Sequence, residues 1–196
     1  MLKVHQLINN LNAFKIQFPI FEDSHYPHEF LIQISNHFIN NQSFISPSAK
    51  ISPLACIEHP VYIGDNVEIR AFAYVRGNAI ILKNSIIGQS VEIKNSILFE
   101  NVQVPHLSYI GDSILGNYAH LGAGAVISNV RLDKKTIRVQ GIDTGLQKFG
   151  ALLGDGAQIG CNSVINPGSI LMKNSYIIPC TNFSGLLQEG ENNKYK

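Results

Sequence analysis

The sequence lacks tryptophan, has only three cysteines and shows no marked excess of charge of either sign. Fifteen lysines and arginines stand against 14 aspartates and glutamates, so a basic surface for nucleic acid or an anionic membrane is not indicated. No window approaches the run of about 20 apolar residues that spans a bilayer. Residues 1–14 interrupt their apolar residues with polar ones, which a signal peptide does not do. We therefore expect a cytoplasmic protein with no nucleic-acid or membrane partner.

The scarcity of cysteine also excludes two classes of small-domain architecture. Cys56, Cys161 and Cys180 are an odd number and show no CxxC spacing. A disulfide framework needs pairs of cysteines, and a structural zinc site needs clustered ligands. We expect reduced structural thiols that are buried as small hydrophobic side chains.

What the sequence has instead is an apolar residue at every sixth position from 45 to 99. The series is Ile45, Ile51, Ile57, Ile63, Ile69, Val75, Ile81, Ile87, Ile93 and Phe99. Chance would give such a run on the order of once in a few thousand trials. Four residues beyond each position the side chain is usually small, as at Ala49, Ala55 and Ala73. A period of six is typical of a coil of short straight segments whose inward side chains fill a narrow prism.

This pattern resembles the hexapeptide repeat of left-handed parallel β-helix proteins, over about Ile45 to Phe183. The resemblance alone implies the left hand, because the general preference for right-handed crossovers would predict the opposite. We expect an all-β solenoid over residues 45–183, followed by a C-terminal tail at 184–196. The period slips after Phe99, and slips in a solenoid are where loops or sites tend to lie. Residues 129–150, rich in charge and glycine, predict a loop that projects from the prism.

The first 44 residues lack the repeat. Apolar residues at helical spacing predict a helix over residues 28–39, and residues 2–14 are a weaker helix candidate. The end of a solenoid exposes unpaired strand edges and core, so we expect this segment to be a partly helical cap. A remnant linker and an oligomer contact remain open as alternatives.

Four blocks inside the repeat carry a more specific resemblance. They read FAYVRG at 72–77, VEIKNS at 91–96, HLSYIGDSILG at 106–116 and LGAGAVISN at 121–129. They resemble the blocks FARLRPG, VEMKKA, HLTYLGDAEIG and IGAGTITCN of one acetyltransferase domain. It is the C-terminal domain of the bifunctional N-acetylglucosamine-1-phosphate uridyltransferase and glucosamine-1-phosphate acetyltransferase family. The spacing of twelve residues between Lys94 and His106 is also preserved. The hexapeptide repeat alone would indicate only the fold.

The resemblance implies transfer of acetyl from acetyl-CoA, as co-substrate, to the amine of an amino-sugar phosphate, with glucosamine-1-phosphate as the first candidate. His106 falls on the catalytic histidine, which takes a proton from the attacking amine. An imidazole suits this task because its ordinary pKa of about 6.5 lies near working pH. Gly122, Ala123 and Gly124 match the place where backbone approaches the thioester, and Cys161 is expected beside them. The transfer itself requires no metal.

Residues for the sugar phosphate are implied in the same way. Arg76 and Lys94 fall on the basic residues that hold the phosphate, and an arginine fork with a lysine charge suits a dianion. Tyr109 and Asn129 match residues that contact the sugar and orient its amine.

The sequence departs from the family at several positions. His120 stands where the family often has an asparagine that contacts the sugar, and Val130 replaces a tyrosine, so the identity of the sugar is open. Lys135 lies six residues after Asn129, and this position resembles that of a further lysine that contacts substrate in the family. The alternatives in the same loop are Lys134, Arg138 and Lys148. No glycine-rich nucleotide signature occurs near the start, so we expect a transferase without a uridyltransferase domain.

Three other functions remain open. One is a γ-class carbonic anhydrase, whose zinc would be held by His59, His106 and His120. Another is an acyltransferase that takes its acyl chain from an acyl carrier protein. The last is a non-catalytic β-helix that binds a sugar nucleotide or acts as a scaffold.

The resemblance also implies a homotrimer with active sites between chains. A flat face bearing apolar side chains beside the inward positions is the expected interface. Its residues are Ile80, Ile86, Ile97 and Leu98.

Overall fold

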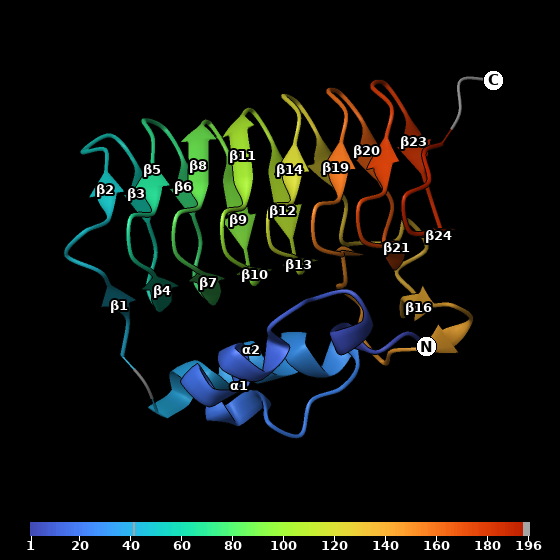
Figure 1. Ribbon diagram of the computed structural model, residues 1–196, viewed down its shortest axis with the longest axis horizontal. Coiled ribbons are helices and arrows are strands. Elements are labelled where there is room, and N and C mark those ends of the chain that lie inside the picture. The colour runs from blue at the N-terminus through green and yellow to red at the C-terminus, as the bar shows by residue number, and fades with distance from the viewer. Residues whose placement is uncertain (41, 194–196) are drawn as a thin grey trace.

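The computed structural model describes residues 1–40 and 42–193 and shows a three-sided parallel β-solenoid with short helices along one side (Figure 1). Two 3-10 turns, η1 (Val4–Gln6) and η2 (Pro19–Phe21), accompany helices α1 (Leu11–Gln17) and α2 (Pro27–Asn40). The solenoid predicted from the period of six is confirmed.

Three sheets run the length of the solenoid, and we name them A, B and C. Sheet A contains β1 (Phe44–Ile45), β4 (Val61–Ile63), β7 (Ala79–Ile81), β10 (Ile97–Leu98), β13 (Ile114–Leu115), β18 (Ala151–Leu153), β21 (Ser169–Leu171) and β24 (Leu186–Leu187). Sheet B contains β2 (Lys50–Ile51), β5 (Glu68–Ile69), β8 (Ile86–Gln89), β11 (Gln103–His106), β14 (His120–Leu121), β19 (Gln158–Ile159) and β22 (Tyr176–Ile177). Sheet C contains β3 (Cys56–Ile57), β6 (Tyr74–Val75), β9 (Glu92–Lys94), β12 (Tyr109–Gly111), β15 (Val126–Ile127), β20 (Val164–Ile165) and β23 (Asn182–Phe183).

The corners between the sheets recur in the order AB, BC and CA. Each strand pairs in parallel with the strand one coil further along, so equivalent residues stack in columns. Strand β24 pairs with β21, so the solenoid extends to Leu187 and the tail predicted for 184–196 is shorter. Residues 194–196 of that tail lie outside the described residues.

The core of the prism consists of the predicted inward column, except that the last predicted residue, Phe99, is not part of it. Leu98, not Phe99, points into the prism and is fully buried there. Phe99 faces outward and packs on Phe14, with ring centroids 4.9 Å apart. The step from Ile93 to Leu98 is therefore five residues, which makes the CA corner between them one residue shorter than the corners before it.

The helices cover the outer face of sheet A rather than the end of the solenoid (Figure 1). Ile80, Ile97 and Ile114 form an outward column of this sheet, and all three are completely buried beneath the helices. Burying each such side chain stabilises the fold by about 1.5–3 kcal/mol. The prediction of an oligomer interface is therefore wrong for Ile80 and Ile97, because the chain's own N-terminal segment covers them, and for Leu98, which points into the prism. Ile86 lies on sheet B, outside the covered face, and its part in an interface stays a prediction.

Helix α2 forms where the spacing of apolar residues predicts a helix. Pro27 occupies its first turn, and Glu29 accepts hydrogen bonds from the backbone N–H groups of His25 (2.6 Å) and Tyr26 (2.8 Å). These contacts satisfy donors that the beginning of a helix leaves unpaired. The buried side of the helix carries Phe30, Leu31, Ile34 and Phe38.

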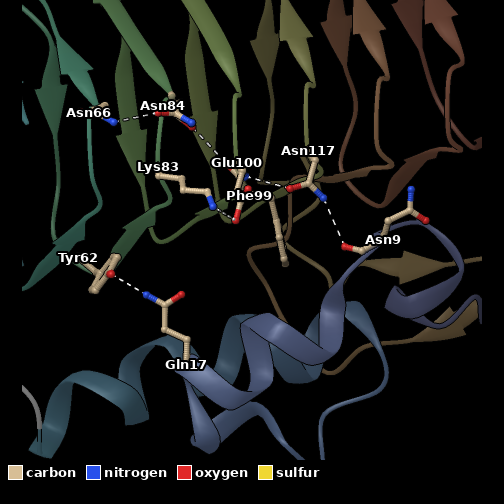
Figure 2. Close-up of polar contacts among 10 residues, drawn as sticks. Asn9, Gln17, Tyr62, Asn66, Lys83, Asn84, Phe99, Glu100 and Asn117 are labelled. Carbon is tan, nitrogen blue, oxygen red and sulfur yellow. Dashed lines mark hydrogen bonds and ion pairs between the residues drawn. The ribbon is translucent and has the colours of Figure 1, made fainter.

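Polar contacts at the AB corner fix the beginning of the chain in place (Figure 2). Asp155 is 8% exposed, and its carboxylate accepts hydrogen bonds from the backbone N–H groups of Asn9 (2.7 Å) and Asn117 (2.8 Å). The Asn117 side chain donates to the same carboxylate at 3.0 Å and to the Asn9 carbonyl at 3.4 Å. Further along, the Gln17 side chain donates to the Tyr62 hydroxyl at 2.6 Å.

Replacing Asp155 with alanine is expected to lower the free energy of unfolding by about 2–4 kcal/mol, because several hydrogen bonds to one charged group are lost together. Urea denaturation measures this change, and limited proteolysis shows whether residues 1–40 have become accessible. Asp23 is exposed, so Asp23→Ala is a matched control that should stay within about 0.5 kcal/mol of wild type. Equal stabilities of the two variants would show that the AB-corner contacts do not hold the helices.

The insertion at 129–150 leaves the solenoid at the CA corner and folds back against the N-terminal segment, where a loop projecting from the prism was predicted. Its short hairpin consists of β16 (Arg138–Val139) and β17 (Ile142–Asp143), which pair antiparallel. Ile137 and Phe149 are buried in the cluster that contains the helices. The Leu2 backbone N–H donates to the Gln140 side chain at 2.6 Å.

The prediction that the cysteines are buried is wrong, because Cys56, Cys161 and Cys180 are all exposed. Strand alternation explains Cys56, which precedes the inward Ile57 and must face outward. In the part of the chain that the structure describes, no helix is both long enough and apolar enough to cross a membrane.

Candidate functional site

Four residues predicted to hold a sugar phosphate come together at the CA corner. Arg76 follows β6, Lys94 ends β9, Tyr109 begins β12 and Asn129 follows β15, so four successive coils each contribute one. Strand register places Lys94 beside Gly111, two residues from Tyr109. The alternation of side chains along each strand turns Arg76, Lys94 and Tyr109 to the outer face of sheet C.

Asp112 is the buried centre of this group. Its carboxyl is 4% exposed and accepts hydrogen bonds from the side chains of Asn129 and Asn95, the latter at 2.7 Å. Burial raises the pKa of Tyr109, the charge of Asp112 adds to this rise, and a hydrogen bond with Asn129 opposes it. A signal for Asp112 was available, since it lies inside the block HLSYIGDSILG.

Gly111 makes this arrangement possible through its missing side chain. A Cβ atom there would lie 2.5 Å from both the Asn129 Nδ2 atom and the Tyr109 hydroxyl oxygen. Real Cβ contacts are essentially never closer than 3.0 Å. Glycine at this position therefore allows Tyr109 and Asn129 to meet.

Cationic side chains border the same group. Arg76 pairs with Glu92 at 3.1 Å, and its Nε atom is buried with no hydrogen-bond partner among the described residues. Burial lowers the pKa of Lys94, Asp112 opposes this effect, and the neighbouring Lys148 and Arg76 lower the pKa further. Three cations gathered in a partly buried corner favour an anionic ligand, which would relieve their mutual repulsion.

The structure brings Lys148, rather than Lys135, beside Lys94. Val130 and Lys148 form an antiparallel bridge at the base of the insertion, and the Phe149 N–H donates to the Asn129 carbonyl at 3.0 Å. Lys135 lies in an exposed turn, where its backbone N–H donates to Asp133 at 3.3 Å. Both lysines were candidates in the sequence, but the path of the loop could not be predicted from it.

A second group lies at the BC corner. His106 ends β11 with its side chain exposed, and its carbonyl accepts from Ser108 Oγ (2.9 Å) and from the Gly124 N–H (3.3 Å). Cys161 stacks one coil beyond Gly122, so closely that a Cβ on Gly122 would lie 2.6 Å from the Cys161 nitrogen. His106, the glycines and Cys161 therefore follow one another along a single corner. Gly124 has φ +74°, a conformation that glycine adopts without strain.

The two groups lie on opposite edges of sheet C. Strand β12, which connects them, contains three residues, or roughly 10 Å at about 3.3 Å per residue. His120 lies apart from both, on the outer side of sheet B between Gln103 and Gln158. Within one chain, the length of this strand thus separates His106 from Lys94 and Asn129.

The three histidines of the zinc alternative lie in different places. His59 is at a CA corner, where its ring contacts the Ser43 hydroxyl at 2.7 Å, while His106 and His120 belong to sheet B. Among the residues that the structure describes, no group of three or more histidine, cysteine or acidic side chains is placed to hold a metal ion.

Comparisons with known proteins find similar sequences over much of this chain. Residues 72–144 match the family described as "GMPPB C-terminal domain". The "Bifunctional protein GlmU" of Methanococcus aeolicus is 34% identical over 168 residues, which cover 75% of this chain and 41% of that protein. The "Bifunctional sugar-1-phosphate nucleotidylyltransferase/acetyltransferase" of Sulfurisphaera tokodaii is 39% identical over 100 residues, which cover 49% and 25% respectively. This chain thus spans less than half the length of these relatives.

One solved structure similar to this chain is that of the hexapeptide transferase family protein from Anaplasma phagocytophilum. It aligns with a TM-score of 0.48 at 20% identity and covers 64% of this chain and 67% of that one.

Proposed function

We propose that this chain, whose β-helix is related in sequence to the bifunctional GlmU proteins, transfers acetyl from acetyl-CoA to the amine of an amino-sugar phosphate. The resemblance makes glucosamine-1-phosphate the first acceptor to test. The observation that carries the proposal is the CA corner, where Arg76, Lys94, Tyr109 and Asn129 gather from four coils. Structural demands on a solenoid corner do not require this combination of residues.

In the proposed complex, the acceptor phosphate binds Arg76, Lys94 and Lys148. The buried Nε atom of Arg76 has no partner among the residues that the structure describes, so a phosphate oxygen would satisfy it. The sugar lies against Tyr109 and Asn129, which Asp112 holds in place. This orientation brings the amine to the thioester in a geometry suited to attack.

The reaction forms one C–N bond and breaks one C–S bond. The amine attacks the thioester carbonyl, and His106 takes a proton from the nitrogen as the bond forms. The Ala123 N–H donates to the carbonyl oxygen as negative charge develops on it, because the N–H groups of Gly122 and Gly124 already donate to the carbonyls of Ile159 and His106. The proton passes to sulfur as the C–S bond breaks, and coenzyme A leaves as its thiol. This transfer requires no metal.

The separation of His106 from the CA corner supports a homotrimer with active sites between chains. One chain would supply His106 and its neighbour would supply Lys94 and the insertion. Sheets B and C are the faces left for such contacts, because the helices cover sheet A.

Co-refolding two inactive variants, His106→Ala and Lys94→Met, tests this assembly. Equal mixing should restore about a quarter of the wild-type sites, because each restored site needs one intact residue from each of two chains. No restoration in mixed oligomers would overturn the shared site.

The direct test of the function incubates the purified chain with acetyl-CoA and glucosamine-1-phosphate and follows free thiol. Thiol release together with N-acetylated sugar phosphate supports the proposal. Binding of acetyl-CoA without release would indicate another acceptor. Absence of both binding and release would overturn the enzyme proposal in favour of a binding or scaffold protein.

The pH dependence of acceptor binding should reflect the lowered pKa of Lys94. Because Lys94 is charged only below its pKa, its attraction for phosphate is lost at a lower pH than an ordinary lysine would show. We expect the affinity for glucosamine-1-phosphate to fall by about tenfold as pH rises through this pKa.

Calorimetric titrations between pH 7 and 10 measure this loss. The matched control is Lys94→Arg, whose guanidinium stays charged over the whole range. Parallel pH profiles for wild type and Lys94→Arg would show that titration of Lys94 does not govern binding.

A further inference from the structure

A pocket of about 350 Å³ opens between helix α2, the CA corner and the insertion. Ile32 and Ser35 line it from α2, Asp112 from the corner, and Leu146 and Lys148 from the insertion. Its volume lies within the range of about 300–1,000 Å³ that small-molecule sites occupy. The N-terminal segment therefore forms one wall of a site next to the proposed acceptor residues.

Two residues make this pocket continuous with the acceptor site. Asp112 lines the pocket and also accepts the hydrogen bond from Asn129. Lys148 lines the pocket and also lies beside Lys94. A phosphate held by Lys94 and Lys148 would thus stand between the sugar residues and the pocket. In glucosamine-1-phosphate the chain of atoms ends at this phosphate, which leaves the pocket unfilled.

The walls of the pocket combine apolar and hydrogen-bonding groups. Leu31, Ile32 and Leu146 supply apolar surface, while Asn95 and Gln147 supply side-chain amides. Ile32 is 46% exposed, although it belongs to a helix whose other large apolar residues are mostly buried. A nucleobase has apolar faces and a polar edge that match this mixture. A lipid tail would leave the amides without partners, which is costly.

The pocket is held in place before any ligand binds. The Asn78 side chain donates to Ser35 Oγ at 3.4 Å, which ties α2 to the corner after Arg76. The Leu146 carbonyl accepts from the Ile137 N–H at 2.8 Å, which ties the insertion to its own buried base. Binding of a ligand therefore costs little conformational entropy for ordering these walls.

We propose that the acceptor is a nucleoside-diphosphate amino sugar whose nucleoside binds against helix α2. This inference rests on the proposed acetyl transfer to an amino-sugar phosphate. The sugar contacts Tyr109 and Asn129, and the diphosphate contacts Arg76, Lys94 and Lys148. Helix α2 then determines which activated sugar is accepted.

Calorimetric titration of the full chain with uridine-diphosphate glucosamine, guanosine-diphosphate glucosamine and glucosamine-1-phosphate tests the proposal. At least one nucleotide-linked sugar should bind about tenfold or more tightly than the monophosphate, because the nucleoside buries the apolar wall. Ile32→Asp should remove this advantage and leave the affinity for glucosamine-1-phosphate unchanged. The matched control is Ile16→Asp, at an exposed isoleucine of α1, which should preserve the advantage.

The outcomes separate the inference from the proposed function. If glucosamine-1-phosphate is bound and acetylated, and neither nucleotide-linked sugar binds more tightly, the nucleoside pocket is overturned and the acetyltransferase stands. A nucleotide advantage that survives Ile32→Asp would also overturn the pocket. If none of the three sugars binds or is acetylated, the proposed function fails and the inference fails with it.

Discussion

The His106→Ala variant is expected to transfer acetyl groups about 10²- to 10⁴-fold more slowly than wild type, because a positioned general base contributes about this much. The same variant should bind acetyl-CoA and glucosamine-1-phosphate normally. His106 is exposed, and no hydrogen bond to its imidazole occurs among the described residues. Its removal therefore opens no cavity in the core, and a loss of rate would report chemistry rather than folding.

The measurement is a steady-state assay of thiol release, with kcat and KM for both substrates. Gln103→Ala is the matched control, because Gln103 is also exposed on strand β11 and lies three residues before His106. The control should retain wild-type kcat. A His106→Ala rate near that of the control would exclude His106 as the base and leave the histidine a surface residue of the BC corner.

The inward residues of the solenoid could be predicted from the sequence because a narrow prism accepts one kind of pattern. Large apolar side chains every six residues leave few other ways to bury them. The assignment of Phe99 failed for a local reason, since Leu98 and Phe99 are both large and apolar and either could continue the series. Contact with Phe14, more than eighty residues away, places Phe99 outside, and the repeat contains no information about that contact.

The outward apolar column of sheet A also shows that the sequence predicts burial but not the contact that produces it. Ile80 and Ile97 indicate a buried face, and the prediction of burial is confirmed. Sequence alone does not say whether another chain or the same chain covers that face. The answer depends on how residues 1–40 reach the AB corner through Asn9, Asn117 and Asp155.

At the candidate site, the repeat restricts where the residues of the matched blocks can lie, whereas the loop has no such restriction. Arg76 and Lys94 occupy equivalent positions on successive coils, so their spacing in the sequence translates into a column. Tyr109 begins its strand, level with Glu92, and its hydroxyl meets Asn129 across Gly111. The insertion has no repeat, and its path depends on the bridge between Val130 and Lys148. The two five-residue steps of the period run from Ile93 to Leu98 and from Ile110 to Leu115. They contain Lys94 and Asp112, and their shortened corners bring Asn95 and Asp112 into contact.

Gly88→Ala is expected to lower the free energy of unfolding by more than about 3 kcal/mol, beyond the usual cost of overpacking. A Cβ on Gly88 would lie 1.6 Å from the Pro105 carbonyl oxygen and 2.1 Å from its carbonyl carbon. Both atoms belong to the backbone of the neighbouring strand β11, so strands β8 and β11 must separate to admit the methyl group. Since Pro105 immediately precedes His106, any folded molecules should also lose acetyl transfer.

Gly141→Ala is the matched control, because Gly141 has φ +78° and open space around it. Alanine there costs conformational strain alone, about 1 kcal/mol. Urea denaturation of both variants therefore separates strain from steric exclusion. Similar losses in the two variants would mean that the β8–β11 pair adjusts easily. A large loss confined to Gly88→Ala would show that close contact of these strands holds the backbone on which His106 stands.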